Sequence, residues 1–572
     1  MDSVIRNRLL MAGIGAIAGF SLYALFEVLD QALLPDRAAL WLTCFAAVFF
    51  TALLAMTGPF PVLRAGVRAL ALALLVATLL FWAGFRYDSL SSFANGTLAF
   101  LAVLVLATLP LPFIIAADGP GWRDYPTLFS QSWTILVRMS AAWVFVGVVW
   151  LVVFLSDALL SMVGVTLIGD AIENSGVIFV ISGAVLGLGL AVVAELSDMV
   201  SPSLVLRLLR LLLPVVVVVM AVFLLAVPLR GMTEVFQSLS AGFILLAMAA
   251  AGITLVSTAV DQTDADAAHQ PVIAGAARAV CLMLPLLAAL GAWSVWQRVA
   301  QYGWTPERLF AATVAMFALA YGILYAVAVL RGPVWRAQVR RGNTLMAILL
   351  MAVAVMWLTP VFNAERISSH DQLARFKSGA VKAEALDMVA LDSWGRAGAQ
   401  VRAELEVLAA TPGQEALAAR LALTDTVTPA DPAVAVAALA AQMPLQPPTA
   451  TATRDFLLAG LDGYTVNDWA MACGRNLPDG KPGCLMVVAD LWPREPGEEA
   501  IVLLNQGGWA MMQGLIFRDG KTETRQVWAG AGGTLDTQAA LALLSAWQSE
   551  APPLAPVPLN QLGVEGGLIL LP

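Results

Sequence analysis

Charged residues, histidine and lysine are scarce in this sequence. Only 13% of its 572 residues are charged, whereas soluble domains carry about 25%. With two histidines, His269 and His370, we expect no histidine-rich metal centre and no cofactor. Lysine is missing from residues 1–362, and all four lysines lie in residues 363–572. Motifs that would identify an enzyme are missing as well: the sequence has no HExxH, GxSxG, SxxK or Walker A pattern.

Apolar residues, by contrast, are abundant. The chain is 60% hydrophobic, and its mean hydropathy is +0.81. Residues 1–362 hold 18 Arg and 17 acidic residues and are close to neutral. Residues 363–572 hold 10 Arg, 4 Lys and 23 acidic residues, a net charge of −9. The contrast predicts a membrane region followed by an acidic soluble region, and it argues against nucleic acid as a partner.

The apolar runs predict an all-α polytopic transmembrane bundle over residues 1–362. A spanning helix needs about 20 mostly apolar residues, and eleven runs qualify, with ten or twelve spans as alternatives. We expect the first run to be an uncleaved span, because ten more follow it. Residues 159–172 are too short to span and indicate an interfacial or re-entrant piece, and residues 122–133 predict a surface helix. The predicted spans are 9–29, 38–57, 65–85, 96–117, 135–157, 176–195, 206–228, 239–260, 275–296, 309–330 and 344–362.

Arginines near the span ends predict the orientation, because cytoplasmic loops are enriched in positive charge. With eleven spans and a cytoplasmic N-terminus, thirteen arginines fall inside and five outside. We therefore expect a bacterial inner-membrane protein whose C-terminal region is periplasmic. The inside set is Arg6, Arg8, Arg64, Arg68, Arg123, Arg138, Arg207, Arg210, Arg278, Arg331, Arg336, Arg340 and Arg341, and the outside set is Arg37, Arg86, Arg230, Arg298 and Arg308.

The cysteines agree with this orientation. Cys473 and Cys484 bound the turn-rich loop "CGRNLPDGKPGC", and in an oxidising compartment they would form a disulfide. Two unpaired thiols, or a metal half-site without partners, are the alternatives. Cys44 and Cys281 fall inside spans, where we expect them to act as packing residues.

Within the spans, small residues indicate close helix packing. Gly15 and Gly19 form a GxxxG spacing in the first span, and Gly183 and Gly187 form another in the sixth. This spacing lets two helices approach closely. The middles of the predicted spans carry no ionisable residue, although ion-driven transporters usually keep one there.

Three spans contain prolines, and one loop contains facing charges. Such prolines are kinks or mark a broken helix around a substrate site. Glu195 and Asp198 precede Arg207 and Arg210 across a short loop, so we expect ion pairs between the two sets. The prolines are Pro110, Pro112, Pro214 and Pro285.

The region after the last span predicts a soluble α+β domain preceded by helices. Residues 363–443 are Ala-rich and helical, and residues 444–453 predict a linker. Residues 454–572 predict a small antiparallel sheet with a helix packed on one face. Asp519 and Gly520 favour a tight hairpin turn.

Acidic residues in the first outside loop are the only catalytic candidates. Glu27, Asp30 or Asp36 could act as a general base, in the manner of membrane glycosyltransferases that use lipid-linked sugars. Ordinary acidic flanks of an outward-facing loop are the simpler interpretation. His370, just after the final span, could shuttle protons, but Ser369 or Asp371 as the N-cap of the next helix explains this stretch more simply.

Three stretches carry a resemblance to a known family: "YGWTPERL" (302–309), "RGPVWRAQVRRGN" (331–343) and "NAERISSHDQLARFKSGAVKAEALDMVALDSWG" (363–395). With these, the chain resembles the bacterial polytopic membrane proteins of domain of unknown function 4153, over roughly residues 1–400. The resemblance implies an architecture and no catalytic residues.

Three functional hypotheses follow. The first is a non-enzymatic envelope role, in which the periplasmic domain binds or senses an envelope protein and the spans anchor it in the lipid bilayer. The second is a transporter or lipid flippase, which predicts a cavity open to water or lipid between the proline-interrupted spans. The third is a lipid-linked glycosyltransferase-like enzyme that uses Glu27, Asp30 or Asp36.

Overall fold

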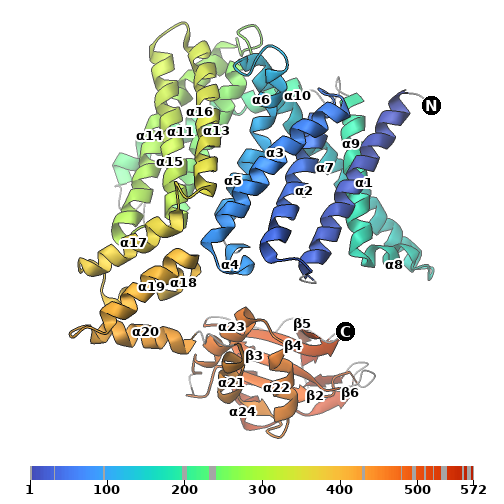
Figure 1. Ribbon diagram of the computed structural model, residues 1–572, viewed down its shortest axis with the longest axis vertical. Coiled ribbons are helices and arrows are strands. Elements are labelled where there is room, and N and C mark those ends of the chain that lie inside the picture. The colour runs from blue at the N-terminus through green and yellow to red at the C-terminus, as the bar shows by residue number, and fades with distance from the viewer. Residues whose placement is uncertain are drawn as a thin grey trace. The chain divides into compact units, whose positions relative to one another are not determined.

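The computed structural model divides into two compact units, Met1–Leu405 and Glu406–Pro572 (Figure 1). The boundary falls inside the helical segment predicted over residues 363–443. The residues that the structure describes are 3–30, 33–94, 97–195, 202–230, 240–427, 432–477, 479–492, 497–507, 510–518, 521–529, 537–556, 560–562 and 568–570.

The first unit is the helical bundle that the apolar runs predict. Within the described residues, eleven helices are long and apolar enough to cross a membrane, which indicates a multi-pass membrane protein. Two spans consist of two consecutive helices, α5–α6 and α10–α11, and Pro110 begins α6. The spanning helices are α1 (Ser3–Asp30), α2 (Asp36–Met56), α3 (Val62–Ala83), α5 (Thr97–Thr108), α6 (Pro110–Ala117), α7 (Tyr125–Ser161), α9 (Ser175–Glu195), α10 (Pro202–Arg210), α11 (Leu213–Arg230), α13 (Ser240–Val260), α14 (Pro271–Tyr302), α15 (Pro306–Leu330) and α16 (Trp335–Leu358).

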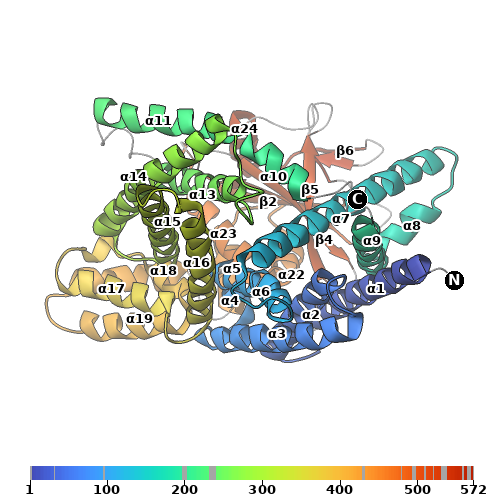
Figure 2. The same ribbon diagram turned by 90° about the horizontal axis from the view of Figure 1, so that it is seen from above.

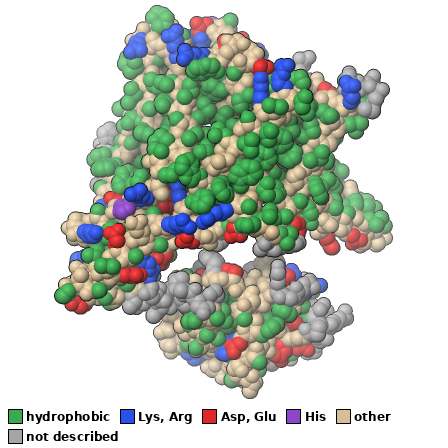
Figure 3. All heavy atoms as spheres, in the orientation of Figure 1, with side chains coloured by type: hydrophobic (Ala, Val, Ile, Leu, Met, Phe, Trp, Pro, Cys, Tyr) green, Lys and Arg blue, Asp and Glu red, His purple; other side chains and the backbone are tan. Residues whose placement is uncertain are grey.

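The spans alternate in direction, so each end of the bundle gathers a fixed set of helix termini. We call the end at which α1 begins the proximal end, and the end at which α1, α3 and α16 finish the distal end. Apolar side chains cover the bundle between its ends, near which charged side chains gather (Figure 3). Shorter helices of this unit are η1 (Gly84–Arg86), α4 (Leu90–Ala94), α8 (Leu167–Glu173), α17 (Ala364–Lys377), η2 (Ala383–Ala385), α18 (Met388–Ser393) and α19 (Gly395–Ala409).

Buried side chains form two main apolar clusters in the bundle. The first cluster joins α2, α3, α5 and α16, and the second joins α11, α13, α14 and α15. Helix α16 contributes to both clusters, through Leu358 near its distal end and Val339 near its proximal end. Seen from above, α16 lies between the two groups of helices (Figure 2). The bundle therefore has two lobes that share α16 and, through Leu309, the beginning of α15.

The four predicted glycines bring α1 and α9 together. A Cβ atom on Gly15 would overlap the carbonyl oxygen of Gly183, and a Cβ atom on Gly183 would overlap that of Gly15. Gly19 and Gly187 approach the backbone of the facing helix in the same way. Each helix thus uses its GxxxG spacing as the contact surface for the other.

The ion pair expected between Glu195 and Arg207 or Arg210 is wrong. Glu195 instead accepts hydrogen bonds from Arg8 Nε, at 3.1 and 3.0 Å, which ties the beginning of α1 to the end of α9. Arg210 pairs with Asp261, in the loop that follows α13. Asp198 lies outside the described residues. Both observed pairs join segments that are distant in sequence.

Helix α7 is longer than predicted. Its 37 residues extend about 55 Å at 1.5 Å per residue, well beyond the roughly 30 Å core of a bilayer. Residues 122–133, predicted as a separate surface helix, mostly form its first turns. Residues 159–172, predicted as an interfacial or re-entrant piece, contain the end of α7, a turn and most of α8.

The helix after the last span begins earlier than predicted. Asn363 is the N-cap of α17, because its side-chain oxygen accepts a hydrogen bond from the Arg366 amide at 2.9 Å. Ser369 and Asp371, the predicted caps, lie inside the helix. Gly379, with a φ of +76°, follows the end of α17 in the left-handed conformation that glycine favours there.

The second unit contains the predicted sheet. Among the described residues the strand order is β1-β2-β3-β4-β5-β8-β7-β6, and neighbouring strands run antiparallel except β1 and β2, which are parallel. The predicted turn at 519–520 lies outside the described residues, between the antiparallel partners Arg518 and Lys521. The strands are β1 (Leu445–Gln446), β2 (Cys484–Ala489), β3 (Glu499–Asn505), β4 (Ala510–Arg518), β5 (Lys521–Ala529), β6 (Leu554–Pro556), β7 (Asn560–Leu562) and β8 (Leu568–Leu570).

Helices cover both faces of this sheet, whereas the sequence predicted a helix on one face. Because side chains alternate along a strand, Met486 of β2 packs with α21, α22 and α23, and Val487 packs with α24 on the opposite face. A disulfide between Cys473 and Cys484 joins the end of α23 to the beginning of β2. The helices of this unit are α20 (Glu415–Val427), α21 (Pro432–Gln442), α22 (Thr451–Ala459), α23 (Gly463–Cys473) and α24 (Thr537–Ser549).

Candidate functional site

Arg86 organises the distal end of the bundle. It follows α3, and its guanidinium donates to the carbonyl oxygens of Trp357 at 2.6 Å and Thr359 at 2.8 Å, where α16 ends. Arg86 Nη1 also lies 3.2 Å from the Glu365 carboxylate on α17, and the two side chains are only 10% and 12% exposed. Removing either partner would leave a buried charge unpaired, which destabilises proteins by about 3–5 kcal/mol.

Tyr87 and Gly395 lie next to this ion pair. The Tyr87 hydroxyl donates to Glu365 at 3.3 Å, and burial followed by the charge of Glu365 raises the pKa of Tyr87. Gly395 has a φ of +57°, and a Cβ atom there would come 2.6 Å from the Arg86 carbonyl oxygen. Only glycine therefore lets α19 begin this close to the end of α3.

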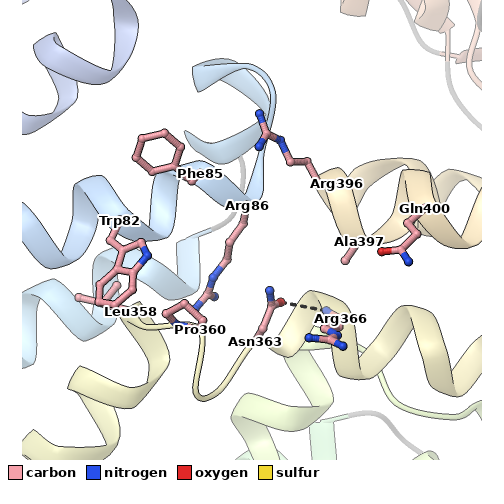
Figure 4. Close-up of a pocket in the computed structure, with 10 residues that line it drawn as sticks. All are labelled: Trp82, Phe85, Arg86, Leu358, Pro360, Asn363, Arg366, Arg396, Ala397 and Gln400. Carbon is pink, nitrogen blue, oxygen red and sulfur yellow. Dashed lines mark hydrogen bonds between the residues drawn. The ribbon is translucent and has the colours of Figure 1, made fainter.

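An arginine-lined hollow lies next to Arg86 (Figure 4). Its volume is about 420 Å³, and of its ten described lining residues three are arginine and none is acidic. The Arg86 side chain runs toward Pro360, whereas Arg396 extends from α19 toward the end of α3 (Figure 4). Its lining residues are Trp82, Phe85, Arg86, Leu358, Pro360, Asn363, Arg366, Arg396, Ala397 and Gln400.

The three arginines differ in how much of their hydrogen-bonding capacity is used. Arg86 is engaged with Glu365 and backbone carbonyls. Arg396 Nε donates to Asp88 at 2.8 Å, and both side chains are exposed. In the described part of the chain, the guanidinium of Arg366 has no hydrogen-bond or ion-pair partner. Arg366, with its whole guanidinium, and Arg396, with the two Nη groups that its contact to Asp88 leaves over, are therefore the residues able to meet an anion.

The other side of the hollow is apolar and exposed. Trp82 is 51% exposed and Phe85 40% exposed, and both belong to the last part of the third span. The guanidinium of Arg37 lies over the Phe85 ring, 4.4 Å from its centre. Aromatic residues at a span end are typical of the level of lipid headgroups.

Two further hollows adjoin the first. A hollow of about 230 Å³ has Arg86, Glu307 and Glu365 in its lining. A hollow of about 310 Å³ has Asp36, Arg37 and Asp88 in its lining. Consecutive hollows share Arg86 or Tyr87 in their linings, so the three are neighbours at the distal end.

The acidic candidates from the sequence fall in different surroundings. Asp36 begins α2 and lines the 310 Å³ hollow. Glu27 lies on α1 and hydrogen-bonds with Tyr23 of the same helix. Asp30 ends α1, and its side chain lies outside what the structure describes. The hypothesis that one of them is a general base stays a prediction.

The predicted proton shuttle is an exposed residue beside a structural contact. His370 lies on the surface of α17. Its neighbour Asp371 accepts a hydrogen bond from the Trp304 amide at 2.8 Å. Asp371 therefore fastens α17 to the turn between α14 and α15.

Sequence reasoning also missed a partly buried polar network near the proximal end. Asn343 donates to Tyr125 and to Ser257, each at 2.9 Å, and accepts from Tyr325 at 2.6 Å. These residues come from α7, α13, α15 and α16. They tie α7 and α16 to α13 and α15, away from the distal hollows.

One sequence signal could have identified the distal site. Arg86 is one of only five arginines on the predicted outside. Because arginine is enriched on the cytoplasmic side, an arginine on the opposite side is expected to have a specific partner in the structure. The partners of Arg86 lie 271 to 279 residues further along the chain, so the sequence alone did not reveal them.

Comparisons of the chain with protein-family models, with curated proteins and with solved structures find no match. Among the residues that the structure describes, no group of three or more His, Cys, Asp or Glu side chains could hold a metal ion. We therefore infer function from the distal hollows.

Proposed function

We propose that the chain is an inner-membrane protein with a cytoplasmic proximal end, and that the distal end and the second unit face the periplasm. The excess of arginine at one side of the spans supports this orientation. The disulfide between Cys473 and Cys484 supports it too, because such bonds persist in oxidising compartments. We also propose membership of the family of domain of unknown function 4153, on the three stretches quoted above.

Within that frame, we propose a non-enzymatic envelope role in which the distal end binds the anionic headgroup of a membrane lipid. One observation carries the proposal: three arginines and no carboxylate line a hollow beside exposed aromatic residues at a span end. A lipid phosphate is the anion available at this depth. Arginine binds phosphate through two parallel hydrogen bonds.

The roles of the arginines follow from their contacts. Arg366 and Arg396 would contact the phosphate. Arg86 would position Arg366, since its hydrogen bonds to the end of α16 and to Glu365 fix α17 against α3, and Asp88 would position Arg396. Trp82 and Phe85 would lie beside the part of the lipid chains that is nearest the headgroup.

Native mass spectrometry of the full chain in detergent tests this proposal. Phosphatidylglycerol and phosphatidylethanolamine with identical chains are titrated against wild type and the double variant Arg366→Gln/Arg396→Gln. At about 1 kcal/mol per arginine and tenfold per 1.4 kcal/mol, we expect the variant to lose about 30-fold in affinity for phosphatidylglycerol.

Arg341→Gln is the matched control, because Arg341 is an exposed arginine at the proximal end of α16. It should leave the affinity unchanged. Equal binding of the two lipids by wild type, or equal losses in the control and the double variant, would overturn the headgroup proposal.

A second candidate is lipid transport. It is favoured by an apolar hollow of about 450 Å³ between α5, α13, α15 and α16. Of the proline-interrupted spans, the α5–α6 span alone contributes to its described lining. Reconstituted protein that moves fluorescent phospholipid between leaflets faster than protein-free vesicles would support transport, and equal rates would oppose it.

A further inference from the structure

The apolar hollow lies at the junction of the two lobes. Helix α5 belongs to the first cluster, α13 to the second, and α15 and α16 to both. Its lining is apolar except for Thr254, Thr313 and Tyr321. Leu101 and Leu104 in the lining are exposed, so the hollow opens at the surface of the bundle, where lipid chains would surround it.

The apolar hollow adjoins the 230 Å³ hollow at the distal end. Leu98 and Trp357 line both the apolar hollow and the 230 Å³ hollow that contains Arg86 and Glu365. Trp357 belongs to α16, and its own carbonyl oxygen accepts the hydrogen bond from Arg86. Beyond Trp357 the lining therefore includes charged residues, namely Arg86, which is paired with Glu365, and Glu307.

We propose that the apolar hollow holds a hydrocarbon chain of the same anionic lipid whose headgroup meets Arg366 and Arg396. The proposal rests on the headgroup function above and extends it to a two-compartment lipid site. Its occupant is an amphiphile with a negatively charged headgroup and a long chain, because the apolar hollow and the arginine-lined hollow both share lining residues with the 230 Å³ hollow between them. The hollow's volume is in the range of small-molecule sites, about 300–1,000 Å³.

The two compartments contribute differently to binding. A chain that moves from the bilayer into an apolar hollow gains no hydrophobic free energy, because lipid tails are as apolar as leucine. It gains dispersion contacts that an unfilled hollow would forfeit. The headgroup contacts therefore set the affinity, and the hollow sets where the chain lies.

This separation gives a test with two readouts. The full chain is reconstituted with phosphatidylglycerol that carries a photoreactive diazirine on its acyl chain, and adducts are mapped by peptide mass spectrometry. We expect the adducts to concentrate on α5, α13, α15 and α16. Native mass spectrometry of the same variants reports headgroup affinity.

Ala250→Phe is the test variant, because Ala250 of α13 lines the hollow and is exposed to it. Ala251→Phe is the matched control, since Ala251 is also exposed but is not among the lining residues. Ala250→Phe should reduce adducts in the hollow about tenfold while affinity for phosphatidylglycerol changes by less than about threefold. Ala251→Phe should change neither.

The outcomes separate the two proposals. If adducts spread evenly over all lipid-facing helices, the apolar hollow does not hold the lipid chain. If the arginine double variant still binds more weakly in that case, the headgroup proposal is retained. The headgroup function and its link to the hollow would be overturned by a different result. In that result, phosphatidylglycerol and an equally labelled phosphatidylethanolamine both give adducts concentrated in the hollow, and the double variant binds as well as wild type.

Discussion

Glu499 is a buried carboxylate whose surroundings make the second unit sensitive to pH. The residue is 5% exposed, and its Oε2 accepts hydrogen bonds from the amides of Leu491 at 2.8 Å and Trp492 at 3.1 Å. Burial raises its pKa more than these bonds lower it. A carboxyl whose pKa is higher in the folded state stabilises the fold below its unfolded pKa, and this contribution disappears as the pH rises through the folded value.

We therefore predict that β2 and β3 lose stability as the pH rises from about 4.5, the ordinary pKa of a glutamic acid. Glu499→Gln keeps an oxygen for the two amides and removes the charge, so it should abolish this slope and increase protection at pH 7. Hydrogen exchange of β2 and β3 amides in the full chain, corrected for intrinsic rates, measures the effect. Glu498→Gln, at the exposed neighbour, should keep the wild-type slope; an unchanged slope in Glu499→Gln would contradict the prediction.

At the scale of residues, local patterns were predictable and long-range partners were not. Gly379 after α17 follows from its immediate neighbours in the sequence. The partners of Glu195 and Arg210 do not, because the nearest opposite charges in the sequence are not the nearest in space. In a bundle of long helices, residues more than 180 positions apart meet whenever two helix ends coincide, as Arg8 and Glu195 do.

Helices α1 and α9 provide a prediction at the scale of elements. Gly15 faces the Gly183 backbone without space for a side chain, whereas a Cβ atom on Gly13 would have no heavy atom within 4 Å. Gly15→Ala should force the helices apart and destabilise the protein by about 1–3 kcal/mol, as overpacking does. Gly13→Ala should be neutral or stabilise α1 by up to about 1 kcal/mol.

Thermal unfolding of the two variants in one detergent measures the difference directly. The chemical change is identical in both, so helix propensity cancels and only the contact with α9 distinguishes them. Equal transition midpoints would mean that the close approach of α1 and α9 does not stabilise the protein.

Helices and strands with a clear pattern of apolar residues were predictable from the sequence, and those that depend on contacts with other elements were not. The spans follow from runs of apolar residues, and β4 and β5 follow from alternation around a turn signal. Helices α22 and α23 were missed because they are short, and α23 packs its Trp469 under the sheet. The full length of α7 was missed because its first turns are polar enough to suggest a separate helix.

At the scale of the whole molecule, the distal site could not be predicted because no continuous stretch contains it. Arg86, Glu365 and Arg396 come from three segments that only the folded bundle brings together. The acidic residues singled out from the sequence shared one loop, and proximity in sequence is a poor guide to proximity across helix ends. A search for arginines placed against the charge bias is the better guide in such proteins.

Sidedness is the prediction on which the proposed function depends. The native cysteines are unreactive toward an impermeant maleimide, because Cys44 and Cys281 are buried and the other two are bonded. A cysteine introduced by Asp455→Cys, at an exposed position of the second unit, should react in intact cells. One introduced by Arg341→Cys, at the proximal end, should react only after the inner membrane is permeabilised.

The opposite labelling pattern would mean that the bundle has the opposite orientation in the membrane. The arginine hollow would then face the cytoplasm, and its ligand would come from the inner leaflet or from soluble phosphates. Reaction of both variants in intact cells would mean that the chain does not separate the two ends across a membrane. The predicted pattern alone leaves the outer leaflet as the source of the lipid, because at the distal end only its headgroups reach Arg366 and Arg396.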